Sequence, residues 1–198
     1  MIPLPRSFYS REPALVAREL LGTLLLRRSK EGLTGGRIVE TEAYLAEGDS
    51  SSHSHRGPTK RNASMFGPAG HAYVYTIHAK WCVNVVTEDV GRGSAVLIRA
   101  IEPLFGLPVM QQRRGREKLL ELARGPARLC QALDIDRRLD GWDLTLGKEL
   151  WISDAAEDRL EEPIVTSSRV GISSATELML RFFYEGNSFV SGRRSARK

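Results

Sequence analysis

Residues 35–45 read GGRIVETEAYL, and this stretch decides how the sheet is organised. Its apolar residues predict a β-strand, yet Glu40 and Glu42 stand in the middle, where glutamate is depleted. Side chains alternate in direction along a strand, so we expect the two glutamates to share one face with Ile38 and Tyr44. Two carboxylates on one face of a strand either lie in water or form part of a site.

Segments on both sides of this stretch predict more strands, with few helices between them. Strands are expected at residues 23–28, 71–78, 83–87, 94–103, 150–153, 164–172 and 180–191, and a glycine-rich turn at 29–36. Helices are expected between Ser10, which can cap the first one, and Gly22, and at residues 106–114, 118–124 and 125–135. Because strands and helices do not alternate regularly, we expect an α+β fold with a mostly antiparallel, curved β-sheet and surrounding helices.

The length and composition predict a single globular domain. The chain has 198 residues, of which 41% are hydrophobic and 27% charged, so it can bury a core of its own. We expect the domain to span residues 1–192 and the basic tail at 193–198 to be disordered. Lys and Arg number 29 against 24 acidic residues, an excess that favours a polyanionic partner.

Cysteine usage and hydropathy predict the compartment. Cys82 and Cys130 lie far apart and form no disulfide framework, which indicates a reducing environment. No apolar run approaches the roughly 18 residues of a membrane span, and the N-terminus has no signal-peptide core. We therefore expect a soluble, cytoplasmic protein that does not bind membranes.

The histidines invite a metal-site interpretation. His53 and His55 are close in sequence, with His71, His78 and Cys82 as possible further ligands. Their spacing matches no common zinc signature, and no second cysteine stands beside them. We therefore expect no metal, and histidines that donate hydrogen bonds or stack in a pocket or on the surface.

A long polar loop at residues 46–64 carries the cations Arg56, Lys60 and Arg61. Loops of this length in compact domains are usually functional or disordered. The aromatic residues near it are Tyr44, Tyr73, Tyr75 and Trp81. Aromatic rings beside cations can stack bases while the cations hold phosphates. The same rings can equally fill a core beneath a solvated loop, so the residues alone leave both interpretations open.

Arg99 lies inside the apolar segment 95–101, and a buried arginine requires a carboxylate partner. Glu42 is a candidate for that partner. A partly buried glutamate can also have a raised pKa suited to base catalysis, although two harmless glutamates on a solvated face remain the alternative. The residues by themselves thus predict a basic α+β protein in which an acid–base pocket is one interpretation.

Several motifs, in order along the chain, resemble the alkyladenine (3-methyladenine) DNA glycosylase family. They are RIVETEAYL (37–45) followed by His53, RNASMF (61–66), HAYVYTIH (71–78), CVNVV (82–86), VLIRAIEP (96–103), GPARLCQAL (125–133) and LRFFYEGNSFVS (180–191). The resemblance covers nearly the whole chain. It implies a monofunctional enzyme without metal or cofactor that hydrolyses the N-glycosidic bond of alkylated or deaminated purines, such as 3-methyladenine and hypoxanthine, in base excision repair.

The resemblance also implies roles for individual residues. Glu42 would activate a water aimed at C1′ of a flipped nucleotide, and Arg99 would orient Glu42 or that water. The residues implied to bind the extruded base are Tyr44, His53, Tyr75 and Asn84. Those implied to hold the DNA backbone are Arg56, Lys60 and Arg61. The implied partner is double-stranded DNA carrying a damaged purine. We expect a monomer, in the cytoplasm or, in a bacterium, at the nucleoid.

One departure from the family pattern concerns the residue that fills the gap left by the flipped base. Members usually carry a tyrosine there, whereas this chain reads YVYTIHAKW and has His78 at that place. We expect His78 to fill the gap as a weaker wedge, with Ile77 or Lys80 as the alternatives.

Two other functions remain open on sequence. A non-catalytic nucleic-acid-binding protein could keep the fold without the activity. A carbohydrate glycosidase could use Glu40 and Glu42 as its pair of catalytic carboxylates. The DNA glycosylase interpretation needs only Glu42 as a catalyst and gives Glu40 a supporting, structural role.

Overall fold

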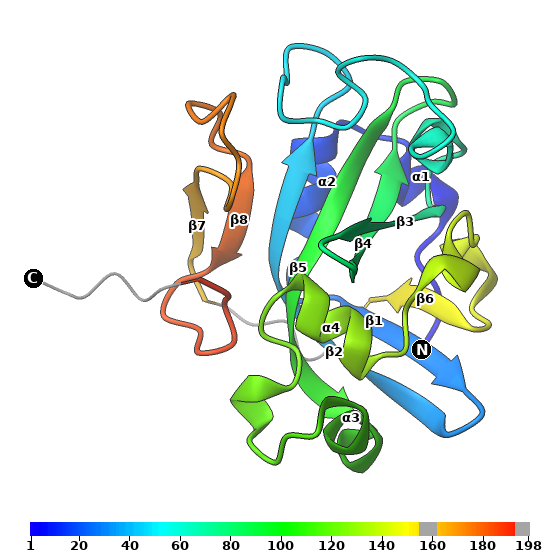
Figure 1. Cartoon of the computed structure of the whole chain (residues 1–198), viewed down its shortest axis with the longest axis vertical. Coiled ribbons are helices and arrows are strands. Elements are labelled where there is room, and N and C mark those ends of the chain that lie inside the picture. Colours follow the sequence, from blue (N-terminus) through cyan, green and yellow to red (C-terminus); the bar gives the residue numbers. More distant parts are fainter. Residues whose placement is uncertain (155–161, 193–198) are drawn as a thin grey trace, which may run out of the picture.

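Strand β2 (Gly32–Tyr44) organises the sheet of the computed structural model, which describes residues 1–154 and 162–192 (Figure 1). It pairs with β5 (Ser94–Phe105) along most of its length. Its first half also pairs with β1 (Leu24–Ser29), and its second half pairs with β8 (Arg181–Tyr184). All these pairings are antiparallel. The tail expected to be disordered, residues 193–198, lies outside the described residues.

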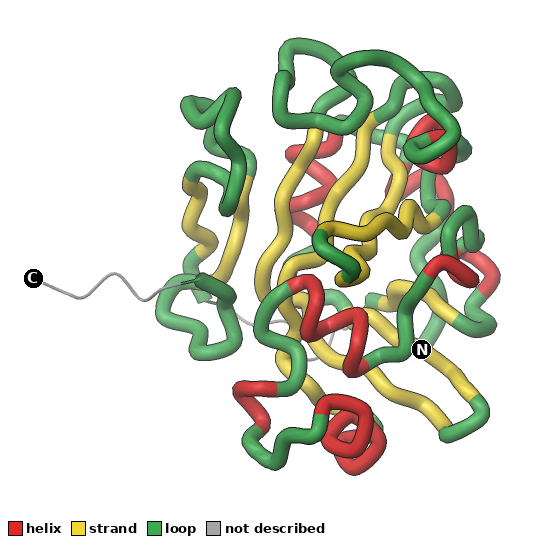
Figure 2. Tube along the Cα trace, viewed as in Figure 1, coloured by secondary structure: helices red, strands yellow, loops and turns green. Residues whose placement is uncertain are grey.

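The other strands extend the sheet from both sides of β2. Next to β5 come β4 (Lys80–Thr87) and β3 (Ala72–Ile77), next to β1 comes β6 (Leu150–Ser153), and next to β8 comes β7 (Ile164–Ser167). Figures 1 and 2 show a strongly curved sheet, with β3 turned across the direction of β5. The expected α+β fold with a mostly antiparallel, curved sheet is confirmed.

The described helices are short. They are α1 (Arg6–Tyr9), α2 (Pro13–Glu19), α3 (Leu107–Arg114) and α4 (Pro126–Ala132), with 3-10 turns at Ala63–Phe66, Leu119–Glu121, Arg137–Leu139 and Leu144–Leu146. The expected cap at Ser10 is wrong: α2 begins after Glu12, whose side chain accepts hydrogen bonds from the amides of Ala14 and Leu15. That interaction satisfies two of the amides that a helix start leaves free, whereas Ser10 ends α1.

Several predicted strand ends are wrong. The strand expected at 164–172 ends at Ser167, because the Arg169 side chain binds Asp49 and the chain leaves the sheet. The strand expected at 180–191 ends at Tyr184, two residues before Gly186 with its positive φ of 71°. By contrast, β4 begins at Lys80, earlier than expected, because only His78 and Ala79 separate it from β3.

The alternation expected along β2 is broken at its centre. Ile38 and Val39 are adjacent, yet both pack in the main core, and the register against β5 shifts between Ile38 and Glu40. The expectation that Ile38 shares a face with Glu42 and Tyr44 is therefore wrong. Such bulges re-aim side chains and are common beside active sites.

The two faces of the sheet have different neighbours beyond this bulge. One face packs with α2 and α4 in the main core. Its inward residues include Val74, Val83, Val85, Val96 and Ile98. The residues between them in sequence, among them Tyr73, Tyr75, Asn84, Leu97 and Arg99, line a cavity on the other face.

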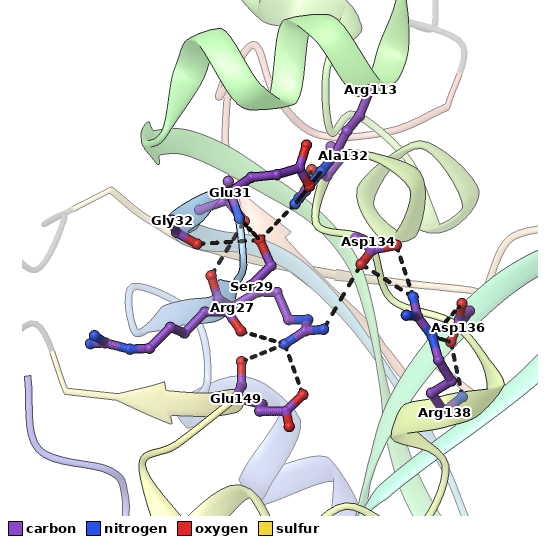
Figure 3. Close-up of polar contacts among 12 residues, drawn as sticks. Arg27, Ser29, Glu31, Gly32, Arg113, Ala132, Asp134, Asp136, Arg138 and Glu149 are labelled. Carbon is purple, nitrogen blue, oxygen red and sulfur yellow. Dashed lines mark hydrogen bonds and ion pairs between the residues drawn. The ribbon is translucent and has the colours of Figure 1, made fainter.

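A polar network fastens the β1–β2 hairpin to the helical layer (Figure 3). Arg27 is buried and pairs with Glu149 at 3.2 Å and with Asp134 at 3.9 Å. Arg113 of α3 pairs with Glu31 and donates to the Ala132 carbonyl of α4. None of these residues lines the cavity, so this network is structural.

Candidate active site

A cavity of about 570 Å³ lies against β2, β3, β4 and β5 and is closed on one side by residues 170–174. Its walls include five of the residues that the family resemblance singles out, namely Tyr44, His53, Tyr75, Asn84 and Arg99. They come from four strands and the loop at 46–64, so the curved sheet brings together residues that are far apart in sequence.

Glu42 lies directly behind this wall and is fully buried. The Tyr44 hydroxyl donates to Glu42 Oε2 at 3.0 Å, and Arg99 Nη1 donates to the same oxygen at 3.1 Å. The backbone amide of Val170 donates to Oε1 at 2.7 Å. All three donor residues line the cavity. A carboxylate can accept about four hydrogen bonds, which leaves one position for a further donor such as water.

Arg99 connects the two glutamates of β2. Its Nε donates to Glu40 at 3.0 Å, its Nη1 to Glu42 at 3.1 Å and its Nη2 to the Ser191 hydroxyl at 3.2 Å. Burial lowers the pKa of Arg99, but the charges of Glu42 and Glu40 outweigh it and leave the pKa above its ordinary value. The guanidinium therefore stays charged. The contact that the sequence suggested between Arg99 and Glu42 is present, and Glu40 is a second partner.

Glu40 is also fully buried, but unlike Glu42 it has only one donor residue, Arg99, that lines the cavity. Besides Arg99, it accepts hydrogen bonds from Arg181 Nε at 2.7 Å and from the Ser191 amide at 2.6 Å. These contacts tie β2 to β8 and to the segment that follows it. A carbohydrate glycosidase would need both carboxylates at the substrate, and Glu40 is occupied by structural contacts instead.

Three rings form an aromatic wall. Tyr73 and Tyr75 stack with ring centres 5.2 Å apart, and the His53 ring meets Tyr75 edge-on at 4.5 Å. His53 Nδ1 lies 2.8 Å from the Tyr73 hydroxyl. Burial lowers the pKa of His53, so its ring is neutral at neutral pH. Two rings in edge contact cannot cover both faces of one base, so a base between His53 and Tyr75 requires the His53 ring to turn.

Two further side chains that face the cavity have fixed orientations. Asn84 of β4 is buried, and its Nδ2 donates to the Tyr73 carbonyl at 2.9 Å, which fixes the plane of its amide. The Arg169 guanidinium lies over one face of the Tyr44 ring, with its carbon 4.6 Å from the ring centre. Burial and the charge of Glu42 raise the pKa of Tyr44 well above its ordinary value, so its hydroxyl remains a donor.

The remaining predicted residues lie outside the cavity. His78 is exposed at the tip of the β3–β4 hairpin. Arg56, Lys60 and Arg61 are exposed on the loop at 46–64. A second hollow of about 850 Å³ adjoins the cavity and shares His53, Tyr73 and Tyr75 with it; its lining also includes Arg56, Arg61 and Arg137. Three arginines thus line the hollow beside the cavity, while Lys60 lies outside both linings.

No sequence pattern singled out Asp49, Arg169 or Val170, although all three bear on Glu42 or Tyr44. Val170 contributes a backbone amide, which no residue pattern reveals. Asp49 and Arg169 look like ordinary loop charges in the sequence, and only the fold shows that they are buried together.

The described residues contain neither a candidate metal site nor a helix that could span a membrane. Across residues 1–154 and 162–192, no three His, Cys, Asp or Glu side chains are grouped so that they could hold a metal ion. Within the same ranges, no helix has both the length and the apolar character needed to cross a membrane.

Comparison with known proteins gives a consistent result. Residues 7–188 match the family described as Methylpurine-DNA glycosylase (MPG). A protein of Methanoculleus marisnigri named "Putative 3-methyladenine DNA glycosylase" is 53% identical over 192 residues, which cover 96% of this chain and 99% of the relative. A protein of Carboxydothermus hydrogenoformans with the same name is 48% identical, covering 95% of this chain and 98% of the relative. The chain belongs to the methylpurine-DNA glycosylase family and is a DNA glycosylase.

Proposed function

We propose that this enzyme removes alkylated or deaminated purines, 3-methyladenine and hypoxanthine among them, from double-stranded DNA as the first step of base excision repair. It acts as a monomer on a nucleotide flipped out of the duplex. The observation that carries this proposal is the buried Glu42, held by Tyr44, Arg99 and the Val170 amide beside an aromatic cavity. The names of the relatives, which specify 3-methyladenine, support the substrate class.

Hydrolysis of the glycosidic bond passes through an oxocarbenium-like state, in which positive charge develops on the sugar. The Glu42 carboxylate stabilises that charge and takes a proton from the attacking water. Its three donors hold it in place, and the position left free accepts the water. The Arg99 guanidinium places a positive charge 3.1 Å from Glu42 Oε2, which offsets part of the cost of burying a carboxylate there.

A base inside a duplex is unreachable, so the enzyme extrudes it and holds it between aromatic surfaces. Tyr44 and Tyr75 supply those surfaces, and the His53 ring turns to close the stack. The Asn84 side chain, fixed by its hydrogen bond to the Tyr73 carbonyl, crowds the 2-amino group of guanine and so disfavours the normal base.

The DNA is bent and held by exposed residues around the entrance. His78, at the tip of the hairpin, enters the gap left by the extruded base, as side chains inserted between base steps do in other DNA-binding proteins. Arg56, Lys60 and Arg61 contact phosphates and give binding its dependence on salt.

Product analysis tests this proposal. Duplexes carrying a single hypoxanthine or ethenoadenine, and randomly methylated DNA, are incubated with excess enzyme, and the released base is identified by chromatography. We expect free damaged base and a strand that stays intact until it is treated with alkali, because no lysine nucleophile is proposed. Duplex binding without release of any base would instead support a non-catalytic DNA-binding protein.

A further inference from the structure

We infer that the ion pair between Asp49 and Arg169 is a positioning device for the catalytic carboxylate, and we call it the Asp49–Arg169 clamp. This inference rests on the proposed function, because it gives the clamp a role in glycosidic-bond hydrolysis. Neither residue touches the substrate in that proposal. The clamp acts through Val170 and Tyr44, which are the direct partners of Glu42.

The clamp is a fully buried, two-pronged ion pair. Arg169 Nη1 lies 2.6 Å from Asp49 Oδ2, and Arg169 Nη2 lies 2.7 Å from Asp49 Oδ1. Both side chains are 0% exposed. Burial alone would raise the pKa of Asp49, but the hydrogen bond from Arg169 and the amide of Leu45 outweigh it and hold the pKa below its ordinary value. Parallel bonds of this kind fix orientation as well as distance.

The Asp49 end of the clamp fixes the end of β2 and the start of the next loop. Asp49 Oδ2 accepts from the Leu45 amide at 3.1 Å, and Oδ1 accepts from the Ser51 amide at 3.1 Å. The loop beginning here leads to His53. Asp49 therefore sets where the strand that carries Glu42 stops and where the aromatic wall begins.

The Arg169 end fixes two partners of Glu42 at once. Its Nη1 also donates to the Ala43 carbonyl at 3.0 Å, and its guanidinium covers the Tyr44 ring at 4.6 Å. The next residue is Val170, whose amide donates to Glu42 at 2.7 Å. A single side chain thus connects the β2 backbone, the Tyr44 ring and the backbone amide that holds the second oxygen of Glu42.

The segment at 168–174 depends on such anchors because no strand pairing holds it. β7 ends at Ser167, and the segment crosses the cavity without joining the sheet. Its far end is held where the Ser51 hydroxyl donates to the Ser174 carbonyl. At the end near Glu42, Arg169 makes the anchoring contacts, so its loss frees the Val170 amide to move away from Glu42.

Single-turnover excision with enzyme in excess tests the clamp. Under these conditions a variant that is merely less stable lowers the reaction amplitude, whereas a misplaced catalyst lowers the rate constant. The variants are Asp49→Asn, Arg169→Gln and the double variant, which leaves no unpaired buried charge. We expect each to lower the rate constant about tenfold to a hundredfold, the scale of small misplacements in active sites, with affinity for undamaged duplex unchanged.

Two further variants separate positioning from folding. Arg169→Lys keeps the charge but not the two-pronged, stacked geometry, so it should restore stability towards the wild-type level without restoring the rate constant. Arg27→Gln removes a buried arginine whose ion pairs (Figure 3) lie outside the cavity lining, and it should lower stability with the rate constant unchanged. We also expect the double variant to be no slower than the slower single variant, because the two residues act as one unit.

The outcomes distinguish this inference from the proposed function. If the wild type excises lesions and Glu42→Gln does not, while the clamp variants keep the wild-type rate constant, the clamp is structural only and the inference is overturned. A rate loss in Arg27→Gln equal to that in the clamp variants would overturn it as well. If the wild type releases no damaged base, or Glu42→Gln releases it as fast, the proposed function itself fails.

Discussion

Around Glu42 the residues have separable tasks. The buried Glu42 carboxylate has no arginine to itself, because Arg99 also donates to Glu40. The Tyr44 hydroxyl and the Val170 amide are its neutral donors. An unsatisfied buried carboxylate would be costly, so these donors both stabilise the charge and fix its direction.

Removing the Tyr44 hydroxyl separates its hydrogen bond from its stacking surface. Tyr44→Phe should lower the single-turnover rate constant about tenfold, since hydrogen bonds to charged groups contribute about 1.5–3 kcal/mol. Affinity for a lesion-containing duplex should stay at the wild-type level because the ring remains. The matched control is Tyr9→Phe, as the buried Tyr9 hydroxyl has no hydrogen-bond partner among the described residues. Equal rates for Tyr44→Phe and the wild type would contradict this role.

At this scale the sequence predicted some contacts and missed others. A lone arginine in an apolar strand had to find a carboxylate, so the pairing of Arg99 with Glu42 was predictable. The burial of Asp49 with Arg169 was not predictable, because both residues stand in polar segments whose path depends on the fold. The hydrogen bond from the Val170 amide to Glu42 could not be predicted for the same reason.

The β3–β4 hairpin is the element that presents His78 to DNA. Its two turn residues, His78 and Ala79, have φ values of 48° and 59°, the left-handed conformation of a tight two-residue turn. Residues with a Cβ adopt this conformation at a cost, so the pairing of β3 with β4 must offset it. An Asn-Gly pair would form this turn at a lower conformational cost. The presence of His78 and Ala79 instead is consistent with a role for the His78 side chain at the tip.

We expect His78→Ala to lower the rate of excision from duplex DNA about tenfold, because the wedge offsets part of the few kcal/mol needed to unstack a base. Excision from single-stranded DNA should not change, since no partner strand closes the gap. Ala79→Gly is the matched control, as it relaxes the turn and keeps the imidazole. Unchanged excision from duplex DNA in His78→Ala would remove this residue from the role and direct attention to Ile77 or Lys80.

Strand cores were easier to predict than strand ends. Alternating and apolar runs gave β1, β3, β5 and β6 nearly their observed bounds. β4 was predicted too short, because Lys80 and Trp81 lack the apolar pattern yet pair with β3. β7 and β8 were predicted too long, because the segments after them look like strands but turn towards the cavity and β2 through side-chain contacts.

For the molecule as a whole, buried ion pairs join the C-terminal segments to the first half of the chain. Arg169 reaches Asp49, and Arg181 reaches Glu40. Completion of the active site therefore requires the last strands to dock on β2. These ion pairs therefore contribute both to the stability of the fold and to the geometry of the active site. The contribution of the Asp49–Arg169 pair to the free energy of unfolding depends on pH.

The Asp49→Asn variant should show that dependence. The folded-state pKa of Asp49 lies below its ordinary value of 3.8, so the unfolded chain takes up this proton first as the pH falls. The ionised carboxyl therefore contributes its full stability above that value and loses it as the pH falls through the folded-state pKa. At neutral pH we expect the variant to be less stable by about 3 kcal/mol, as for other broken buried pairs.

Denaturant unfolding of both proteins between neutral and acidic pH measures this difference. The gap in the free energy of unfolding should be constant at neutral pH and shrink below pH 3.8. Other carboxyl groups are common to both proteins and largely cancel in the difference. A gap that widened on acidification would contradict the assigned sign.

The central claim, that Glu42 is the base that activates water, is tested most directly by the single-turnover rate of Glu42→Gln on a duplex with one hypoxanthine. Glu40→Gln is the control, since Glu40 is the other buried carboxylate bonded to Arg99 and its remaining donors, Arg181 and Ser191, lie outside the cavity lining. We predict that Glu42→Gln binds the duplex normally but excises about 10²–10⁴-fold more slowly, whereas Glu40→Gln keeps most of the rate. Excision by folded Glu42→Gln at the wild-type rate would contradict the account.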